Sequence, residues 1–181
     1  MGRLHPVKDH AFLISACVEL KQRGLPFLCI IIGEGETRRS LHRLIERMGL
    51  PREVKLLGFL DQPFVNIFYQ MADVFVLTSR SEGLPFTIME AMLNETIVLA
   101  PKITGIPEII TNGVNGFLYE GGNMEDFVNK ILYIFEKYES LRSLGKQARN
   151  HILQYFDRRT NMEAFADTIV RRLESANLTD R

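Results

Sequence analysis

The chain has 181 residues, a length that fits one domain with a single buried core. Its 22 Lys and Arg residues balance its 22 Asp and Glu residues, so no basic field indicates nucleic acid as a partner. We expect no signal peptide, and no apolar run approaches the about 20 residues that a membrane-spanning helix needs. Cys17 and Cys29 lie in apolar stretches without a Cys-x-x-Cys pairing, so we expect reduced core thiols and a cytoplasmic location.

Apolar periodicity predicts alternating helices and strands along most of the chain. Helices are expected at residues 9–23, around 41–48, at 61–71 and from 85 onward, and strands at 26–32, 54–59, 73–77, 96–100 and 117–119. The short run 73–77 is apolar and rich in β-branched residues, which is typical of a strand buried on both faces of a parallel sheet.

The last third of the chain has a helical pattern. Asn123 is expected to cap a helix that places Phe127, Ile131, Ile134 and Tyr138 on one face. A second apolar stripe comprises Met162, Phe165, Ile169 and Val170. We therefore expect one domain, residues 1–181, with C-terminal helices at about 124–173.

The strongest functional signal is a polar loop, residues 79–91, that follows the strand at 73–77 and continues into a helix. Ligands of open α/β sheets bind outside the carboxyl ends of the strands. Pro85 suits the first helical position, where its missing N–H is no loss. The backbone N–H groups between Gly83 and Phe86 can then point outward and bind an anion.

Two glutamates flank this helix start. Glu82 stands at its entrance, and Glu90 lies two turns further along. Carboxylates accept hydrogen bonds from hydroxyl groups, so beside an anion site they suit a ligand that is both a sugar and a phosphate. On spacing alone, Glu82 could equally be a charge placed near a helix N-terminus, and Glu90 could equally be an exposed helical residue.

Five motifs occur in a characteristic order. They are Gly2-Arg3-Leu4 followed by Lys8, Gly33-Glu34-Gly35, Ala72-Asp73-Val74-Phe75-Val76, the E-x7-E pair of Glu82 and Glu90, and Gly105-Ile106-Pro107-Glu108 leading to Asn115-Gly116-Phe117. This set resembles retaining glycosyltransferases of the two-domain GT-B architecture, in particular glycosyltransferase family 4 (glycosyl transferases group 1), over residues 2 to about 135. The resemblance implies an α/β fold with a Rossmann-like parallel sheet and helices on both faces, the donor-binding C-terminal half of such an enzyme.

The resemblance also implies roles for individual residues. Arg3 and Lys8 would bind the diphosphate of a nucleotide-sugar donor, where fixed cations stabilise the charge that develops on the leaving group. Glu82 would hold hydroxyls of the donor sugar, and Glu90 the ribose hydroxyls. Without the resemblance, the two cations would be read as solvated surface.

Further donor-binding positions follow from the same resemblance. They are Gly33, Gly35, Leu60, Gly83, Leu84, Pro85, Phe86 and Glu108. From the residues alone, Gly33 and Gly35 fit a strand-to-helix turn as well, and Glu108 could instead cap a short helix.

No cofactor is expected, because the nucleotide-diphosphate-sugar is the substrate. No metal is expected either, because the four histidines are scattered and there is no Asp-x-Asp pair. The implied partners are a nucleotide-sugar donor and a glycan or lipid-linked acceptor, the latter held by an N-terminal domain missing here. Products would be polysaccharide, lipopolysaccharide or glycolipid, and the resemblance allows peripheral membrane association of the full enzyme.

In the family a strand precedes the Gly-Arg-Leu triplet, whereas only Met1 does so here. That strand is central in a Rossmann-type sheet, so we expect either direct pairing of its neighbours or a weakened fold. The chain alone should bind donor or nucleotide and transfer little or no sugar. Two alternatives remain: a non-catalytic nucleotide-sugar-binding fragment or subunit, and a sugar-nucleotide epimerase of the same architecture.

Overall fold

A computed structural model of the chain describes residues 1–179, with side chains for all of them except 158, 164 and 173–179. The helices are η1 (Pro6–Lys8), α1 (His10–Gln22), α2 (Arg38–Arg47), α3 (Gln62–Met71), α4 (Phe86–Leu93), α5 (Ile106–Ile109), α6 (Met124–Tyr155) and α7 (Arg158–Thr179). The strands are β1 (Cys29–Ile32), β2 (Val54–Gly58), β3 (Val74–Val76), β4 (Ile97–Pro101) and β5 (Phe117–Tyr119). Every strand pair is parallel, which confirms the predicted α/β fold class.

Capping side chains begin two of the helices as predicted. The Asp9 carboxylate accepts a hydrogen bond from the N–H of Phe12, and the Asn123 side chain accepts one from the N–H of Asp126. The prediction for Pro85 is off by one residue, because Pro85 is the N-cap of α4 and not its first helical residue.

Two strands are shorter than the sequence pattern predicts. The expected strand at 26–32 begins only at Cys29, because Cys29 lies opposite Val54, the first residue of its partner strand β2. The expected strand at 54–59 ends at Gly58, whose φ of +83° leaves the extended region. Phe59 beyond it is 72% exposed.

The strands form two separate sheets. One contains β1 and β2, and the other contains β3, β4 and β5 in that order. In the described part of the chain β1 does not pair with β3, so the gap expected from the missing strand is not closed by its neighbours. A cavity of about 920 Å³, here called the slot, is lined by both strands; its lining includes Cys17, Cys29, Ile31, Val74, Val76 and Ile131.

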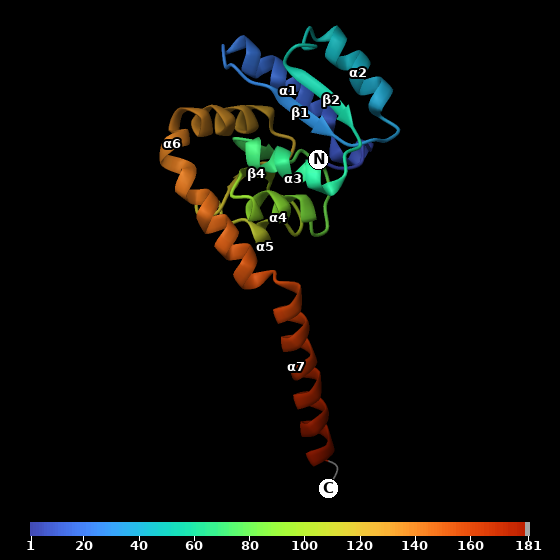
Figure 1. Cartoon of the computed structure of the whole chain (residues 1–181), viewed down its shortest axis with the longest axis vertical. Helices are drawn as coiled ribbons and strands as arrows, with labels where there is room; N and C mark the ends of the chain where they lie inside the picture. The colour runs from blue at the N-terminus through green and yellow to red at the C-terminus, as the bar shows by residue number, and fades with distance from the viewer. Residues whose placement is uncertain (180–181) are drawn as a thin grey trace.

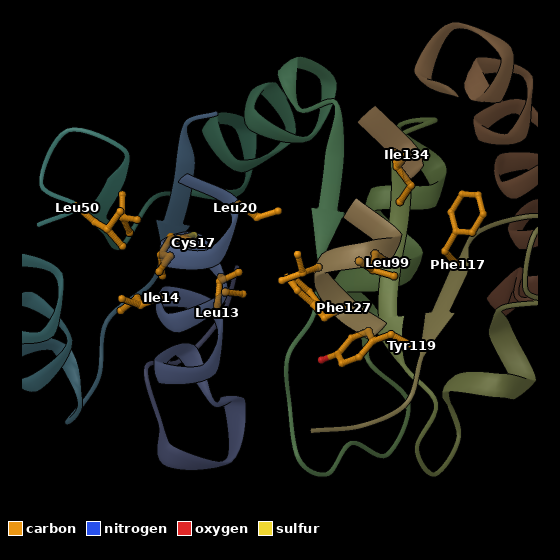
Figure 2. Packing of buried hydrophobic residues seen from close by; sticks show 14 of the residues in the cluster. Leu13, Ile14, Cys17, Leu20, Leu50, Leu99, Phe117, Tyr119, Phe127 and Ile134 are labelled. Carbon is orange, nitrogen blue, oxygen red and sulfur yellow. The ribbon is translucent and has the colours of Figure 1, made fainter. Parts of the chain in front are cut away.

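Helix packing joins the two sheets beside the slot. Helix α1 packs on α6, and Phe12 of α1 stacks on Tyr119 of β5 with ring centroids 6.0 Å apart. Phe127 of α6 meets both rings edge-on. Figure 2 shows Leu13 and Leu20 of α1 on one side of this core and Leu99, Phe127 and Tyr119 on the other. A second core cluster lies between α3, α4, α5 and the sheet of β3 and β4.

Helix α7 extends away from the rest of the molecule (Figure 1). The apolar stripe predicted there is 43–62% exposed and consists of Met162, Phe165, Ile169 and Val170. Within residues 1–179, none of the helices combines the length and the apolar character that a membrane span requires.

Candidate ligand-binding site

The candidate site lies where the strands end. Loops follow the carboxyl ends of β1, β3 and β4 at residues 33–35, 77–85 and 102–105, and the segment 2–9 runs beside them. We call these loops and segment 2–9 the carboxyl edge. It is the position at which parallel α/β sheets bind their ligands.

Segment 2–9 is held against the end of β1. The N–H of Gly2 donates to the Ile32 carbonyl at 2.9 Å, and the N–H of Leu4 donates to the Glu34 carbonyl at 2.8 Å. A Cβ on Gly33 would stand 1.8 Å from the Gly2 carbonyl oxygen, and one on Gly35 would stand 2.2 Å from that of Leu4. At both glycines the missing side chain lets the backbone of segment 2–9 approach closely. The contacts of Gly33 and Gly35 with a donor, expected from the sequence, remain predictions.

Lys8 and Glu82, both predicted as site residues, meet although they are 74 positions apart. Lys8 Nζ lies 2.6 Å from Glu82 Oε1, and the two side chains are 27% and 10% exposed. The hydroxyl of Ser79, itself a buried residue, donates to the same carboxylate oxygen at 2.5 Å. Glu82 is thus held by a cation and a hydroxyl at the entrance to α4.

Further bonds fix the loop of Lys8 to the loop of Glu82. The hydroxyl of Thr78 donates to the Lys8 carbonyl at 3.0 Å. Arg80 Nε lies 2.7 Å from Asp9 Oδ2, and the Arg80 N–H donates to the Val7 carbonyl at 2.8 Å. These contacts connect the segment attached to β1 with the loop that follows β3.

The N-terminus of α4 has no side-chain cap. Its N-cap is Pro85, which makes no capping hydrogen bond, so the first N–H groups of α4 lack the usual side-chain acceptor. The Thr104 hydroxyl donates to the carbonyl of Glu82, which anchors the loop after β4 to this turn. Leu84 and Phe86 are 44% and 70% exposed beside it. The arrangement can accept an anion at the helix start.

Glu90 is held by two side chains of α3. The hydroxyl of the buried Tyr69 donates to Glu90 Oε2 at 3.0 Å, and Gln62 Nε2 lies 3.5 Å from Oε1. Burial raises the pKa of Tyr69 above its ordinary value, and the nearby Glu90 charge raises it further. Tyr69 therefore stays a neutral donor, and the half-buried Glu90 carboxylate keeps acceptor capacity for hydroxyl groups.

The other predicted residues are more peripheral. Arg3 is exposed within segment 2–9, Leu60 is half-buried just before α3, and Glu108 is exposed in the first turn of α5. The N-cap of α5 is Gly105, so the alternative of Glu108 as a cap is wrong. In the part of the chain that the structure describes, no three His, Cys, Asp or Glu side chains cluster as metal ligands do.

Sequence reasoning included Ser79 in the loop 79–91 without giving it a role, and it missed Thr104, Tyr69 and Gln62. Ser79 and Thr104 each come shortly after a buried strand, so a search of the strand ends could have found them. Tyr69 reads only as an apolar helix position in the sequence, and its contact with Glu90 depends on how α3 packs on α4.

The family described as Glycosyl transferases group 1 matches residues 1–151. The chain is 35% identical over 131 residues to the amylovoran biosynthesis glycosyltransferase AmsK of Erwinia amylovora, a match that covers 69% of this chain and 32% of AmsK. Its structure is similar to that of HepE from Anabaena in complex with UDP, with a TM-score of 0.82 and 30% identity, over 94% of this chain and 48% of HepE. HepE is also known in complex with UDP-glucose.

A third similar structure is the C-terminal domain of the group 1 family protein LpcC from Francisella tularensis. The TM-score is 0.77 at 22% identity, over 87% of this chain and 84% of that domain, which shows a shared fold. The chain spans 29–41% of the length of the curated relatives it matches. A large part of each relative therefore has no counterpart in these residues.

Proposed function

Because the chain belongs to the family of glycosyl transferases group 1, we propose that it is the donor-binding half of a retaining, GT-B glycosyltransferase of family 4. In this proposal it binds a nucleotide-diphosphate-sugar, and the complete enzyme transfers the sugar to a glycan or lipid-linked acceptor. AmsK, which is named for amylovoran biosynthesis, supports polysaccharide assembly as the setting. The acceptor site belongs to the part of the enzyme that this chain does not span.

The observation that carries the proposal is the meeting of Lys8, Glu82 and the uncapped start of α4. A lysine ammonium has three hydrogen-bond donors, and Glu82 occupies one of them. Two remain for phosphate oxygens, and the N–H groups at the start of α4 add further donors. Arg3, in the same segment, supplies a second cation for the diphosphate.

The two glutamates are proposed to bind the two sugar rings of the donor. Glu82, held by Lys8 and Ser79, accepts hydrogen bonds from hydroxyls of the transferred sugar. Glu90 accepts from the ribose hydroxyls, with Tyr69 positioning its carboxylate. The complexes of HepE with UDP and UDP-glucose favour uracil as the base of the donor.

Cleavage of the bond between sugar and diphosphate leaves extra negative charge on the leaving group. Lys8, Arg3 and the α4 N-terminus are placed to stabilise that charge as it develops, the task that a divalent cation performs elsewhere. We therefore propose that the reaction needs no metal ion.

Calorimetric titration of the chain with UDP, GDP and ADP and their sugars, in EDTA, tests donor binding. We expect binding of the uridine compounds, weakened about tenfold or more in Lys8→Ala and Glu90→Gln. Arg159→Ala and Glu163→Gln, which alter an exposed ion pair of α7, are the matched controls and should bind as the parent does. Equal affinity in all four variants would contradict the proposed site.

A transfer assay separates the proposed half-enzyme from a complete transferase and from the epimerase alternative. We expect the 181-residue chain alone to bind donor and to transfer little or no sugar. Robust transfer without a second polypeptide would refute its assignment as a donor-binding half. Release of an epimerised sugar in the absence of acceptor would support the epimerase alternative instead.

A further inference from the structure

Asp9 is the single residue between η1 and α1, and its backbone is left-handed, with φ +46° and ψ +46°. A residue with a Cβ rarely adopts this conformation, although Asp is among those that tolerate it. The N–H of Asp9 closes η1 by donating to the Pro6 carbonyl at 3.1 Å, and its Oδ1 opens α1 by accepting from the N–H of Phe12 at 3.3 Å. Asp9 therefore turns the chain from one helix directly into the next.

The loop after β3 holds Asp9 in this conformation. The second carboxylate oxygen of Asp9, Oδ2, lies 2.7 Å from Arg80 Nε, and the two side chains are 14% and 74% exposed. The hydroxyl of the buried Thr78 donates to the Lys8 carbonyl at 3.0 Å and lies 3.3 Å from the Asp9 carbonyl. One loop thus fixes both the side chain and the backbone of Asp9.

The conformation of Asp9 determines where Lys8 points. Helix α1 beyond Asp9 is held in the core by its buried face, which consists of Leu13, Ile14, Ala16, Cys17 and Leu20. Lys8 comes directly before Asp9, and its ammonium lies 2.6 Å from Glu82 Oε1 at the entrance to α4. A return of Asp9 to the common right-handed region, with φ near about −60°, is a rotation of roughly 100° about one backbone bond. Because α1 is fixed, that rotation turns Lys8 away from α4.

We propose that Asp9 is a positioning residue of the donor site and acts through Lys8. The proposal rests on the proposed function in one respect, because it takes Lys8 as a ligand of the donor diphosphate. Glycine at this position adopts the left-handed backbone without strain but has no carboxylate for Arg80 or for the start of α1. Alanine lacks the carboxylate and also carries the strain of the positive φ. Aspartate combines the required backbone with two polar anchors, so Lys8 is in place before a ligand arrives.

The alternative is that Asp9 serves only as the cap of α1. Loss of a helix cap lowers stability, but its effect does not depend on Lys8. Asn123 caps α6 in the same manner, by accepting from the N–H of Asp126, so Asn123→Gly is the matched control. The two roles are separated by measuring the reactivity of the Lys8 amine together with thermal unfolding.

Acetylation by acetic anhydride, followed by mass spectrometry, tests the positioning without any nucleotide. The Lys8 side chain is 27% exposed and bound to Glu82, so its amine should react slowly in the parent. Relative to the exposed Lys146, we expect its rate to rise about tenfold in Asp9→Ala and about threefold in Asp9→Gly. Arg80→Gln should match Asp9→Gly, because it removes the ion pair and leaves the cap intact.

Arg80→Lys keeps a cation for Asp9 and should stay within about twofold of the parent rate. Arg80→Gln also keeps the test decisive if Asp9→Ala does not fold. Unchanged reactivity of Lys8 in Arg80→Gln and Asp9→Gly, with both variants folded, would overturn the proposal. Asn123→Gly should lower the unfolding temperature without changing the reactivity of Lys8.

Titration with UDP tests the link to the donor site. We expect Asp9→Ala to weaken binding about tenfold in the parent and less than about twofold in Lys8→Ala, because Asp9 acts through Lys8. Equal weakening in both backgrounds would overturn the proposal. A parent chain that binds no UDP would contradict the proposed function and not the positioning, which the acetylation rates decide separately.

Discussion

The two sheets of the molecule differ in how completely their strands are covered. In the larger sheet β4 is paired on both sides and all five of its residues are buried. Among residues 1–179, β1 and β2 of the smaller sheet pair only with each other. Leu28, just before β1, and Leu57 of β2 are 60% and 42% exposed. The carboxyl edge nevertheless takes residues from both, with Lys8 attached to the smaller sheet and Glu82 to the larger.

The site therefore depends in part on the sheet whose strands are less completely buried. The larger sheet supplies the helix start, whereas the smaller sheet holds segment 2–9 with its cations. Four predictions test this comparison.

The largest effect is expected at the junction of β1 and segment 2–9. Gly33→Ala places a Cβ 1.8 Å from the Gly2 carbonyl oxygen, so the segment must move. We expect a loss of about 3–5 kcal/mol in the free energy of unfolding, with loss of nucleotide binding. Gly24→Ala is the control: its φ is also positive, but its Cβ meets nothing within 4 Å, so only about 1 kcal/mol is expected. Similar losses of unfolding free energy for Gly33→Ala and Gly24→Ala, measured by urea unfolding, would contradict the close approach of Gly2 to Gly33.

The same substitution in each sheet compares their packing directly. Ile97→Ala in β4 removes a side chain that is 3% exposed, and we expect a cost of about 3–4 kcal/mol in urea unfolding. Ile30→Ala in β1 removes a half-buried side chain that lines the slot. We expect about half that cost, because fewer contacts are lost. Equal costs would mean that the two sheets are equally well packed.

The pH dependence of stability probes the smaller sheet through His10. Burial, aided by the charges of the Met1 amino group and Lys8, lowers the pKa of His10 from 6.5 to about 4. The unfolded chain binds a proton first, so stability is complete above pH 6.5 and falls as the pH drops toward 4. We expect a loss of about 2 kcal/mol across this window.

His10→Gln should flatten that slope, whereas His42→Gln, at an exposed position of α2, should leave it unchanged. The Met1 amino group titrates mainly between pH 8 and 6, so thermal unfolding measured from pH 6 to 4 separates its contribution from that of His10. An unchanged slope in His10→Gln would contradict this assignment.

The smallest effect concerns the ion pair that joins the two sheets. A double-mutant cycle of Lys8→Met and Glu82→Gln should give a coupling of about 1 kcal/mol, at the upper end of the range for such pairs. The exposed pair of Arg159 and Glu163 should give less than about 0.5 kcal/mol. A coupling for Lys8 and Glu82 no larger than that of the α7 pair would weaken the claim that they hold the edge together.

The sequence predicted the fold because each strand is a short apolar run and each helix has a clear stripe. The errors of the sequence prediction lie at strand ends. Strand β1 starts later than predicted because its partner β2 starts opposite Cys29, and no local pattern encodes that register. Whether β1 and β3 would pair with each other depends on how α1 packs on α6 and could not be predicted locally.

Parts of the candidate site could be predicted where a residue with suitable chemistry lies just after a strand of the sheet. Glu82 and Glu90 were found because they flank a helix start after a buried strand. The bond between Lys8 and Glu82, 74 residues apart, and the contact of Tyr69 with Glu90 arise only from tertiary packing. For Gly33 the sequence indicated a close approach, but the group that approaches is the chain's own backbone.

The most direct test of the central claim is a backbone amide NMR titration of the chain with UDP. The account predicts the largest shift changes at Gly83, Leu84 and Phe86 and in segment 2–9, which together span both sheets. A rival position is the polar pocket lined by Lys102 and other residues, about 540 Å³ in volume. Shift changes confined to that pocket, or restricted to residues attached to one sheet, would contradict a donor site that both sheets build at the carboxyl edge.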